Sequence, residues 1–89
     1  MKKRIAVLVR DRQAEALRMA VGLTLEDDEV NVFVMDDKLA DEEAINLNLE
    51  TLRELDIKMY SNNQENGLQV MSTEEIASAL VNYDSVIPY

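Results

Sequence analysis

Two apolar runs separated by a segment of helical periodicity constrain the fold of this chain more than any other feature. Residues 5–9, IAVLV, form a continuous apolar run that is typical of a strand buried on both faces of a sheet. Residues 30–35, VNVFVM, predict a second strand, and its one polar residue, Asn31, allows one side near the start of the strand to reach water. The segment between them carries apolar residues at spacings of 3, 4 and 4, namely Ala14, Leu17, Val21 and Leu25. A strand–helix–strand order of this kind predicts a right-handed crossover between parallel strands.

The remainder of the chain continues the alternation of helices and strands. Residues 41–55 have helical periodicity. Residues 56–60, DIKMY, predict a third strand, and the polar loop SNNQENG follows it. Ser72 and Glu75 have the spacing of a capping box, which predicts the start of a further helix. Residues 85–89 predict a short last strand, which ends near its proline because proline has no N–H to donate to a sheet.

These elements predict one α/β domain over residues 1–89. The length fits this prediction, because single domains usually have about 50–200 residues. We expect a flavodoxin-like three-layer sandwich, in which helices cover both faces of a mainly parallel sheet of about four strands. The strand order expected for this architecture is 2-1-3-4.

The charge balance limits the classes of partner. The chain has 9 basic and 18 acidic residues, a formal net charge of −9. A surface of this sign repels phosphate backbones and anionic lipids, so we expect neither a nucleic-acid nor a membrane partner. No apolar run approaches the roughly 18 residues that span a bilayer. The apolar run after the basic start is also shorter than the roughly 7–15 residues of a signal peptide, so we predict a cytoplasmic protein.

The chain contains no cysteine and no histidine, which narrows its chemistry. The lack of cysteine excludes thiolate catalysis and thiolate metal sites, and the lack of histidine removes the usual general base. We therefore expect no metal, no cofactor and no catalytic residue of the common kinds. Catalysis through Asp36, Asp37 or Tyr60 is the weakest hypothesis, since two adjacent aspartates before a helix are better explained by turn and cap roles.

Polar residues follow each predicted strand at the edge where open α/β sheets bind ligands. The two arginines after the first strand could grip an anion beside the next helix, and the loop after the third strand could supply uncharged hydrogen bonds. The candidate ligand-binding residues are Arg10, Asp11, Arg12, Asp36, Asp37, Tyr60, Ser61, Asn62 and Asn63. Solvated strand ends and helix caps are the competing interpretation of the same residues.

Three passages carry a family resemblance: LTLEDDEVNVFVMDDKL, LETLRELDIKMY and NGLQVMSTEEIASALVNYDSVIPY. With the strand KRIAVLV they cover nearly the whole chain. Through them the chain resembles the DsrE/DsrF/DsrH-like proteins, which include the TusBCD-type sulfur-relay subunits. The resemblance implies a small α/β subunit that assembles as a homo- or hetero-oligomer, commonly a trimer or hexamer.

The resemblance also implies where activity would lie. Active members carry a persulfide on a cysteine in the loop after the strand equivalent to 56–60, and the matching place here is Ser61 or Asn62. Neither a hydroxyl nor an amide can hold a sulfane sulfur by thiol exchange. We therefore expect a non-catalytic subunit, assembled with itself or with a cysteine-bearing paralogue in sulfur metabolism or sulfur relay. The alternative is a small-ligand or anion-binding module at the carboxyl edge of the sheet.

Overall fold

The computed structural model describes residues 3–24 and 29–89, so Leu25 of the predicted first helix lies outside the described residues. Strands and helices alternate there as the sequence predicted. The elements in chain order are β1 (Arg4–Val9), α1 (Gln13–Thr24), β2 (Glu29–Val34), α2 (Glu43–Glu54), β3 (Met59–Ser61), the 3-10 turn η1 (Gln64–Asn66), β4 (Gln69–Val70), α3 (Thr73–Leu80) and β5 (Ser85–Pro88).

The described strands form one parallel sheet of five strands in the order β4-β3-β2-β1-β5. Val7 of β1 pairs with Val32 of β2 on one side and with Ile87 of β5 on the other. The prediction of an α/β fold with a parallel sheet is confirmed. The predicted strand count and the order 2-1-3-4 need correction, because β3 lies beside β2 instead of β1, and the two-residue β4 adds a fifth strand.

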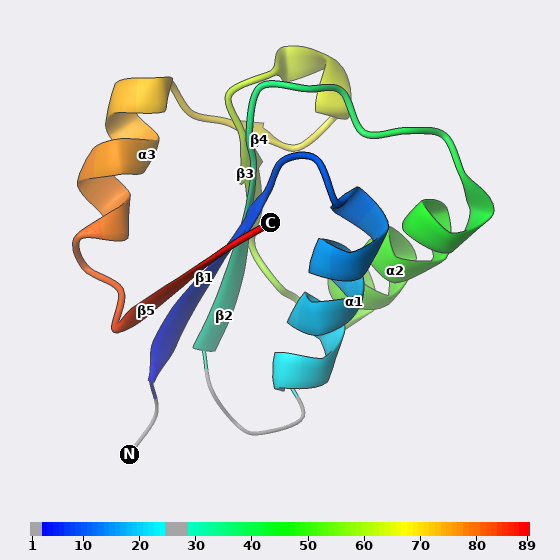
Figure 1. Cartoon of the computed structure of the whole chain (residues 1–89), viewed down its shortest axis with the longest axis horizontal. Coiled ribbons are helices and arrows are strands. Elements are labelled where there is room, and N and C mark those ends of the chain that lie inside the picture. Colours follow the sequence, from blue (N-terminus) through cyan, green and yellow to red (C-terminus); the bar gives the residue numbers. More distant parts are fainter. Residues whose placement is uncertain (1–2, 25–28) are drawn as a thin grey trace.

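The direction of the crossovers explains this strand order. From β1 to β2 and from β2 to β3 the chain steps the same way along the sheet, so right-handed crossovers put α1 and α2 on one face. The connection from β4 to β5 returns across the sheet, and α3 therefore covers the opposite face (Figure 1). α1 and α2 also pack against each other, which the order 2-1-3-4 would prevent by placing them on opposite faces.

The larger core lies between the sheet and the layer formed by α1 and α2. Alternate residues of β1 and β2 face these helices, because successive strand side chains point to opposite faces. Its buried members include Val7, Val9, Val30, Val32, Val34, Leu17, Ile45, Leu49 and Leu52. Full burial of each such side chain stabilises the fold by about 1.5–3 kcal/mol, so this core fixes α1 and α2 on the sheet.

A smaller core lies on the opposite face, where Ala6, Phe33 and Ile76 are buried. Ile76 is the buried residue of α3, a helix of eight residues and therefore about 12 Å long. Five strands at a spacing of about 4.8 Å make a sheet about 19 Å across. One short helix cannot cover that width, and the sheet face over β2, β3 and β4 is left partly open.

Local backbone signals set the element boundaries. The predicted capping box is confirmed, since Ser72 Oγ accepts from the Glu75 N–H at 3.1 Å and Glu75 Oε1 accepts from the Ser72 N–H at 2.9 Å. Asp56 has a left-handed φ of 59° directly after the C-cap of α2. This residue ends the helix instead of opening the predicted strand 56–60, and the third strand accordingly begins only at Met59.

Candidate functional site

Asp36 and Asn62 join the loops that follow β2 and β3 at the carboxyl edge of the sheet. The Asp36 N–H donates to Asn62 Oδ1 at 2.6 Å, and Asn62 Nδ2 donates to Asp36 Oδ1 at 3.0 Å. Asn62 Nδ2 also donates to Thr73 Oγ1 at 3.0 Å, where α3 begins. Asp36 has a left-handed φ of 65°, which Asp tolerates better than most residues. These bonds fix the course of both loops relative to α3.

Further side chains of the loop after β3 extend this cross-linking. Ser61 is 0% exposed, and its Oγ accepts from the Asn63 N–H and from Asn66 Nδ2, both at 3.0 Å. Asn63 Nδ2 donates to the Asp36 carbonyl at 3.1 Å, and Asn66 Oδ1 accepts from the Leu39 N–H at 2.7 Å. The set Asp36, Ser61, Asn62, Asn63 and Asn66 is called the carboxyl-edge clasp below, because its polar groups bind one another.

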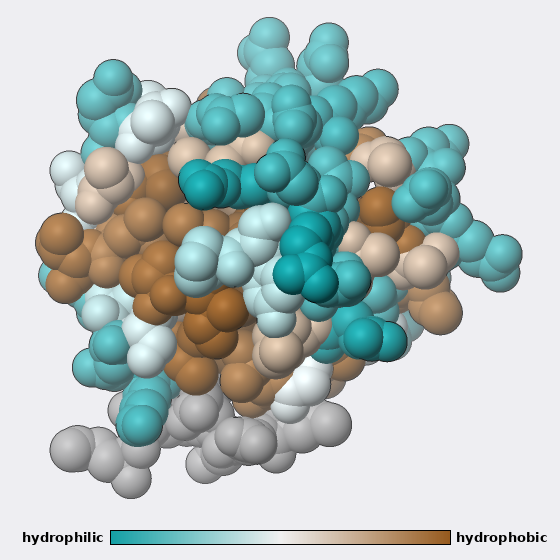
Figure 2. Space-filling view, in the orientation of Figure 1, coloured by the Kyte–Doolittle hydropathy of each residue, from teal (hydrophilic) through white to brown (hydrophobic). Residues whose placement is uncertain are grey.

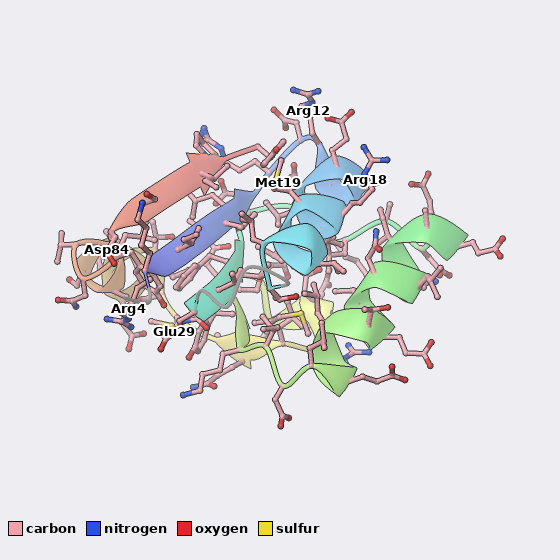
Figure 3. All side chains as sticks on the ribbon, turned by 90° about the horizontal axis from the view of Figure 1, so that it is seen from below. Arg4, Arg12, Arg18, Met19, Glu29 and Asp84 are labelled. Atoms are coloured by element: carbon pink, nitrogen blue, oxygen red, sulfur yellow. The ribbon has the colours of Figure 1, made fainter. Side chains whose placement is uncertain are left out.

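Arg10, Asp11 and Arg12 lie at the same edge of the sheet but beside the end of the chain. The Asp11 and Arg12 N–H groups both donate to the Tyr89 carbonyl at 3.2 Å. The Arg12 guanidinium pairs with Glu15 and lies 5.9 Å from the centroid of the Tyr89 ring. Arg10 is exposed, and Figure 3 shows Arg12 extending outward from the start of α1. An anion held here would have to compete with Glu15 for Arg12.

The predicted residues therefore share an edge of the sheet without forming one site. A shallow hollow of about 470 Å³ opens beside the clasp, lined by Asp36, Asn62, Asn63, Gln64 and Val70. Among these described lining residues there is no arginine, and Asp37 is exposed nearby. Tyr60 is separated from the rest, because its side chain lies on the sheet face covered by α3.

A larger groove, which was not predicted from the sequence, lies on that face. The groove, called the α3 groove below, has a volume of about 670 Å³ and runs between α3 and the strands β2, β3 and β4. The rings of Phe33 and Tyr60 stack along it with centroids 5.2 Å apart, and Tyr83 meets Phe33 edge-on at 5.7 Å. Asn31 is only 7% exposed, and its Nδ2 donates to the hydroxyl of Tyr83.

The sequence carries only part of the signal for the α3 groove. Asn31 and Phe33 alternate with buried valines along β2, so they share one face of the strand. Tyr60 lies directly opposite Phe33 on β3. A polar residue and aromatic rings on one sheet face, with a single short helix to cover it, indicate an incompletely covered surface.

Charged residues close one end of the α3 groove. Arg4 Nε donates to Glu29 Oε2 at 2.9 Å, and the guanidinium carbon of Arg4 lies 4.7 Å from the centroid of the Tyr83 ring. The Arg4 N–H donates to Asp84 Oδ2 at 2.7 Å. The hydrogen bond to Glu29 raises the pKa of Arg4 above its usual value. Figure 3 shows Arg4, Glu29 and Asp84 close together at the amino ends of the strands.

Within 3–24 and 29–89, no group of three or more His, Cys, Asp or Glu side chains is placed to hold a metal ion. In the same part of the chain, no helix has both the length and the apolar character needed to cross a membrane.

No protein-family model, no curated protein and no solved structure matches this chain. The fold and the two surfaces described above define a small α/β protein with a parallel sheet. Its resemblance to the DsrE-like family stays a hypothesis.

Proposed function

We propose that this protein is a non-catalytic DsrE-like subunit that acts by assembly, with itself or with a cysteine-bearing paralogue, in sulfur metabolism or sulfur relay. The proposal rests on which residues occupy the end of β3 and the loop that follows it. In the family that the chain resembles, the loop after this strand holds the persulfide cysteine, whereas here β3 ends at Ser61 and the loop begins at Asn62. The Ser61 hydroxyl is buried and accepts two hydrogen bonds, so it offers neither a nucleophile nor a sulfur carrier.

Asn62, the second residue that matches the position of the family's cysteine, supports the same proposal. Its amide binds Asp36 and Thr73, which makes it a cross-link between two loops and α3. A residue held in this way stabilises the loop geometry without offering a reactive group. The loop thus has a structural role, which is what we expect of a subunit whose partner performs the chemistry.

Exposed hydrophobic side chains beside β5 support assembly as the mode of action. Val81 is 82% exposed and Val86 is 40% exposed. They flank the turn between α3 and β5, and β5 is an edge strand of the described sheet. Figure 2 shows hydrophobic side chains gathered over α3 and β5. Apolar surface beside an open strand edge is typical of contacts between subunits.

Size-exclusion chromatography with light scattering at micromolar concentration tests self-assembly directly. The chain has a mass of 10.1 kDa, and the resemblance favours a particle of three or six chains. A mass of 10.1 kDa at every concentration would exclude self-assembly. The heteromeric form would then be tested by mixing the protein with a persulfide-carrying DsrE-like protein and measuring the mass again.

A pair of matched variants locates the contact. Val81→Asp places a charge in the surface beside β5, and we expect it to convert the assembly to monomers. Leu47→Asp makes the same change on the exposed side of α2, where Leu47 is 61% exposed, and we expect the assembly to persist. Both sites are exposed, so each change should alter the free energy of unfolding by less than about 0.5 kcal/mol. Equal behaviour of the two variants would contradict a contact beside β5.

The alternative, an anion-binding module at the carboxyl edge, has one supporting observation, the exposed side chain of Arg10. A thermal-shift titration with sulfate and phosphate tests it. A rise in melting temperature that Arg10→Ala abolishes would favour this alternative. Because Arg12 already pairs with Glu15, anion binding is the weaker of the two proposals.

A further inference from the structure

The α3 groove has the size of a small-molecule site. Its volume of about 670 Å³ falls within the roughly 300–1,000 Å³ of typical ligand pockets. The sheet face of β2, β3 and β4 forms its floor, and Ala79 and Asn82 at the end of α3 belong to its wall. The small side chain of Ala79 leaves space above the floor.

Aromatic rings are concentrated in this groove. Phe33, Tyr60 and Tyr83 line it, and together with Tyr89 they are all the aromatic residues of the chain. Tyr60 is half-buried, so part of its ring remains accessible from the groove. Because aromatic rings pair favourably with other flat rings beyond the area that they bury, this lining selects a planar ligand.

Asn31 supplies an acceptor to the same groove. Its Nδ2 donates a hydrogen bond to the hydroxyl of Tyr83, while its Oδ1 accepts no hydrogen bond from the described residues. No buried side-chain nitrogen or oxygen among those residues lacks a partner, so this oxygen is open to the groove. Asn31 is only 7% exposed, and its Oδ1 is an acceptor available to an N–H donor in the groove.

The charges around the groove disfavour an anion. Glu29, Asp56 and Glu75 line it, against the two cations Arg4 and Lys58. Arg4 is already paired with Glu29, and the whole chain carries a formal charge of −9. A phosphorylated ligand would be repelled on approach, whereas an uncharged ligand would not.

We propose that the α3 groove binds an uncharged planar heteroaromatic molecule that bears N–H donors, the chemistry of a purine nucleoside. The ring system packs against the accessible part of Tyr60, and an amino group donates to Asn31 Oδ1. A helix from a protein partner fits less well, because its apolar side chains would leave Asn31 Oδ1 without a donor in a dry interface. This inference stands on the groove alone and does not depend on the proposed assembly.

Adenosine is the probe, titrated into the full ¹⁵N-labelled chain and followed by amide chemical shifts. We expect shifts along β2, β3 and α3 and a dissociation constant of about 0.1–1 mM, the range for a ligand of this size at modest efficiency. N6,N6-dimethyladenosine keeps the ring but lacks the amino donors, and we expect it to bind about tenfold more weakly. Adenosine 5′-monophosphate should also bind more weakly at low salt, because the acidic surface repels it.

Two substitutions in the same helix separate the groove from the rest of the surface. Ala79→Phe fills the groove without removing a polar contact, and we expect adenosine affinity to fall at least about tenfold. Ala77→Phe makes the same change at an exposed position of α3 that does not line the groove, and affinity should be unchanged. If Ala79→Phe does not fold, Tyr60→Leu removes the accessible ring instead and should weaken binding likewise.

Three results would overturn the proposal. The first is the absence of amide shifts along the groove with adenosine at the limit of its solubility. The second is equal affinity for adenosine and its dimethyl derivative, which would remove the role of Asn31 Oδ1. The third is undiminished binding to both Ala79→Phe and Tyr60→Leu, which would place the site elsewhere.

Discussion

Asp36 and Asn62 hold each other through two hydrogen bonds of opposite direction, backbone to side chain at 2.6 Å and side chain to side chain at 3.0 Å. The loops that follow β2 and β3 consequently form one unit. Under the proposed DsrE-like assignment, Asn62 is also one of the two positions that would match the reactive cysteine of that family. A residue expected at a chemical centre is here a structural cross-link.

The first prediction concerns the strength of that cross-link. Asn62→Ala removes the bonds to Asp36 and Thr73 and leaves the strained loop unsupported, so we expect the free energy of unfolding to fall by about 1–2 kcal/mol. Urea denaturation followed by circular dichroism measures this change. Gln64→Ala, an exposed residue of the same loop, is the control and should change stability by less than about 0.5 kcal/mol. Equal losses in the two variants would show that Asn62 contributes no specific bond.

The second prediction concerns access to the same loop. A thiol introduced by Asn62→Cys lies at a half-buried position, whereas one introduced by Ser61→Cys replaces a side chain that is 0% exposed. Thiol reactivity requires access, so Asn62→Cys should react with a disulfide reagent at least about tenfold faster and should be the variant that accepts a persulfide. Colorimetric thiol titration and cyanolysis measure the two properties. A fast reaction of Ser61→Cys would mean that the clasp opens readily in solution.

The third prediction tests the polar contact beneath the α3 groove. Tyr83→Phe keeps the ring against Phe33 but removes the hydroxyl that accepts from Asn31 Nδ2. The nearly buried amide then lacks a partner, and we expect a loss of about 1–3 kcal/mol in the free energy of unfolding. Tyr89→Phe is the control, because its hydroxyl makes no hydrogen bond with the described residues. A loss below about 0.5 kcal/mol for Tyr83→Phe would show that water replaces the tyrosine hydroxyl without cost.

The fourth prediction compares Asp36 and Asp56, the two aspartates with positive φ among the described residues. Asp56 has a φ of 59°, and its carboxylate makes no hydrogen bond with the described residues, so Asp56→Gly should stabilise the protein by about 0.5–1 kcal/mol. Asp36 has a φ of 65° but accepts from Asn62, so Asp36→Gly should give a net loss. Thermal and urea unfolding of both variants measure the signs. The same sign in both would contradict a specific role for the Asp36 carboxylate.

How well a feature could be predicted from the sequence depended on how far apart along the chain the interacting residues lie. The capping box at Ser72 and Glu75 was predictable because both partners lie within one helical turn. The start of β3 was not, because the left-handed conformation of Asp56 depends on how α2 ends against the sheet. The placement of polar residues at the carboxyl edge was correct, yet a polar loop pattern does not reveal whether its groups face a ligand or one another. That depends on the distance between loops from different strands, such as those of Asp36 and Asn62.

The sequence by itself determined the alternation of strands and helices and the parallel sheet, because hydrophobic periodicity and helix caps act over a few residues. Only the tertiary structure decided the strand order, since the side on which each crossover helix packs is a long-range property. That order places α1 and α2 together on one face and leaves α3 alone on the other. The α3 groove, with Asn31 in its lining and the ring of Tyr60 accessible within it, is the physical consequence.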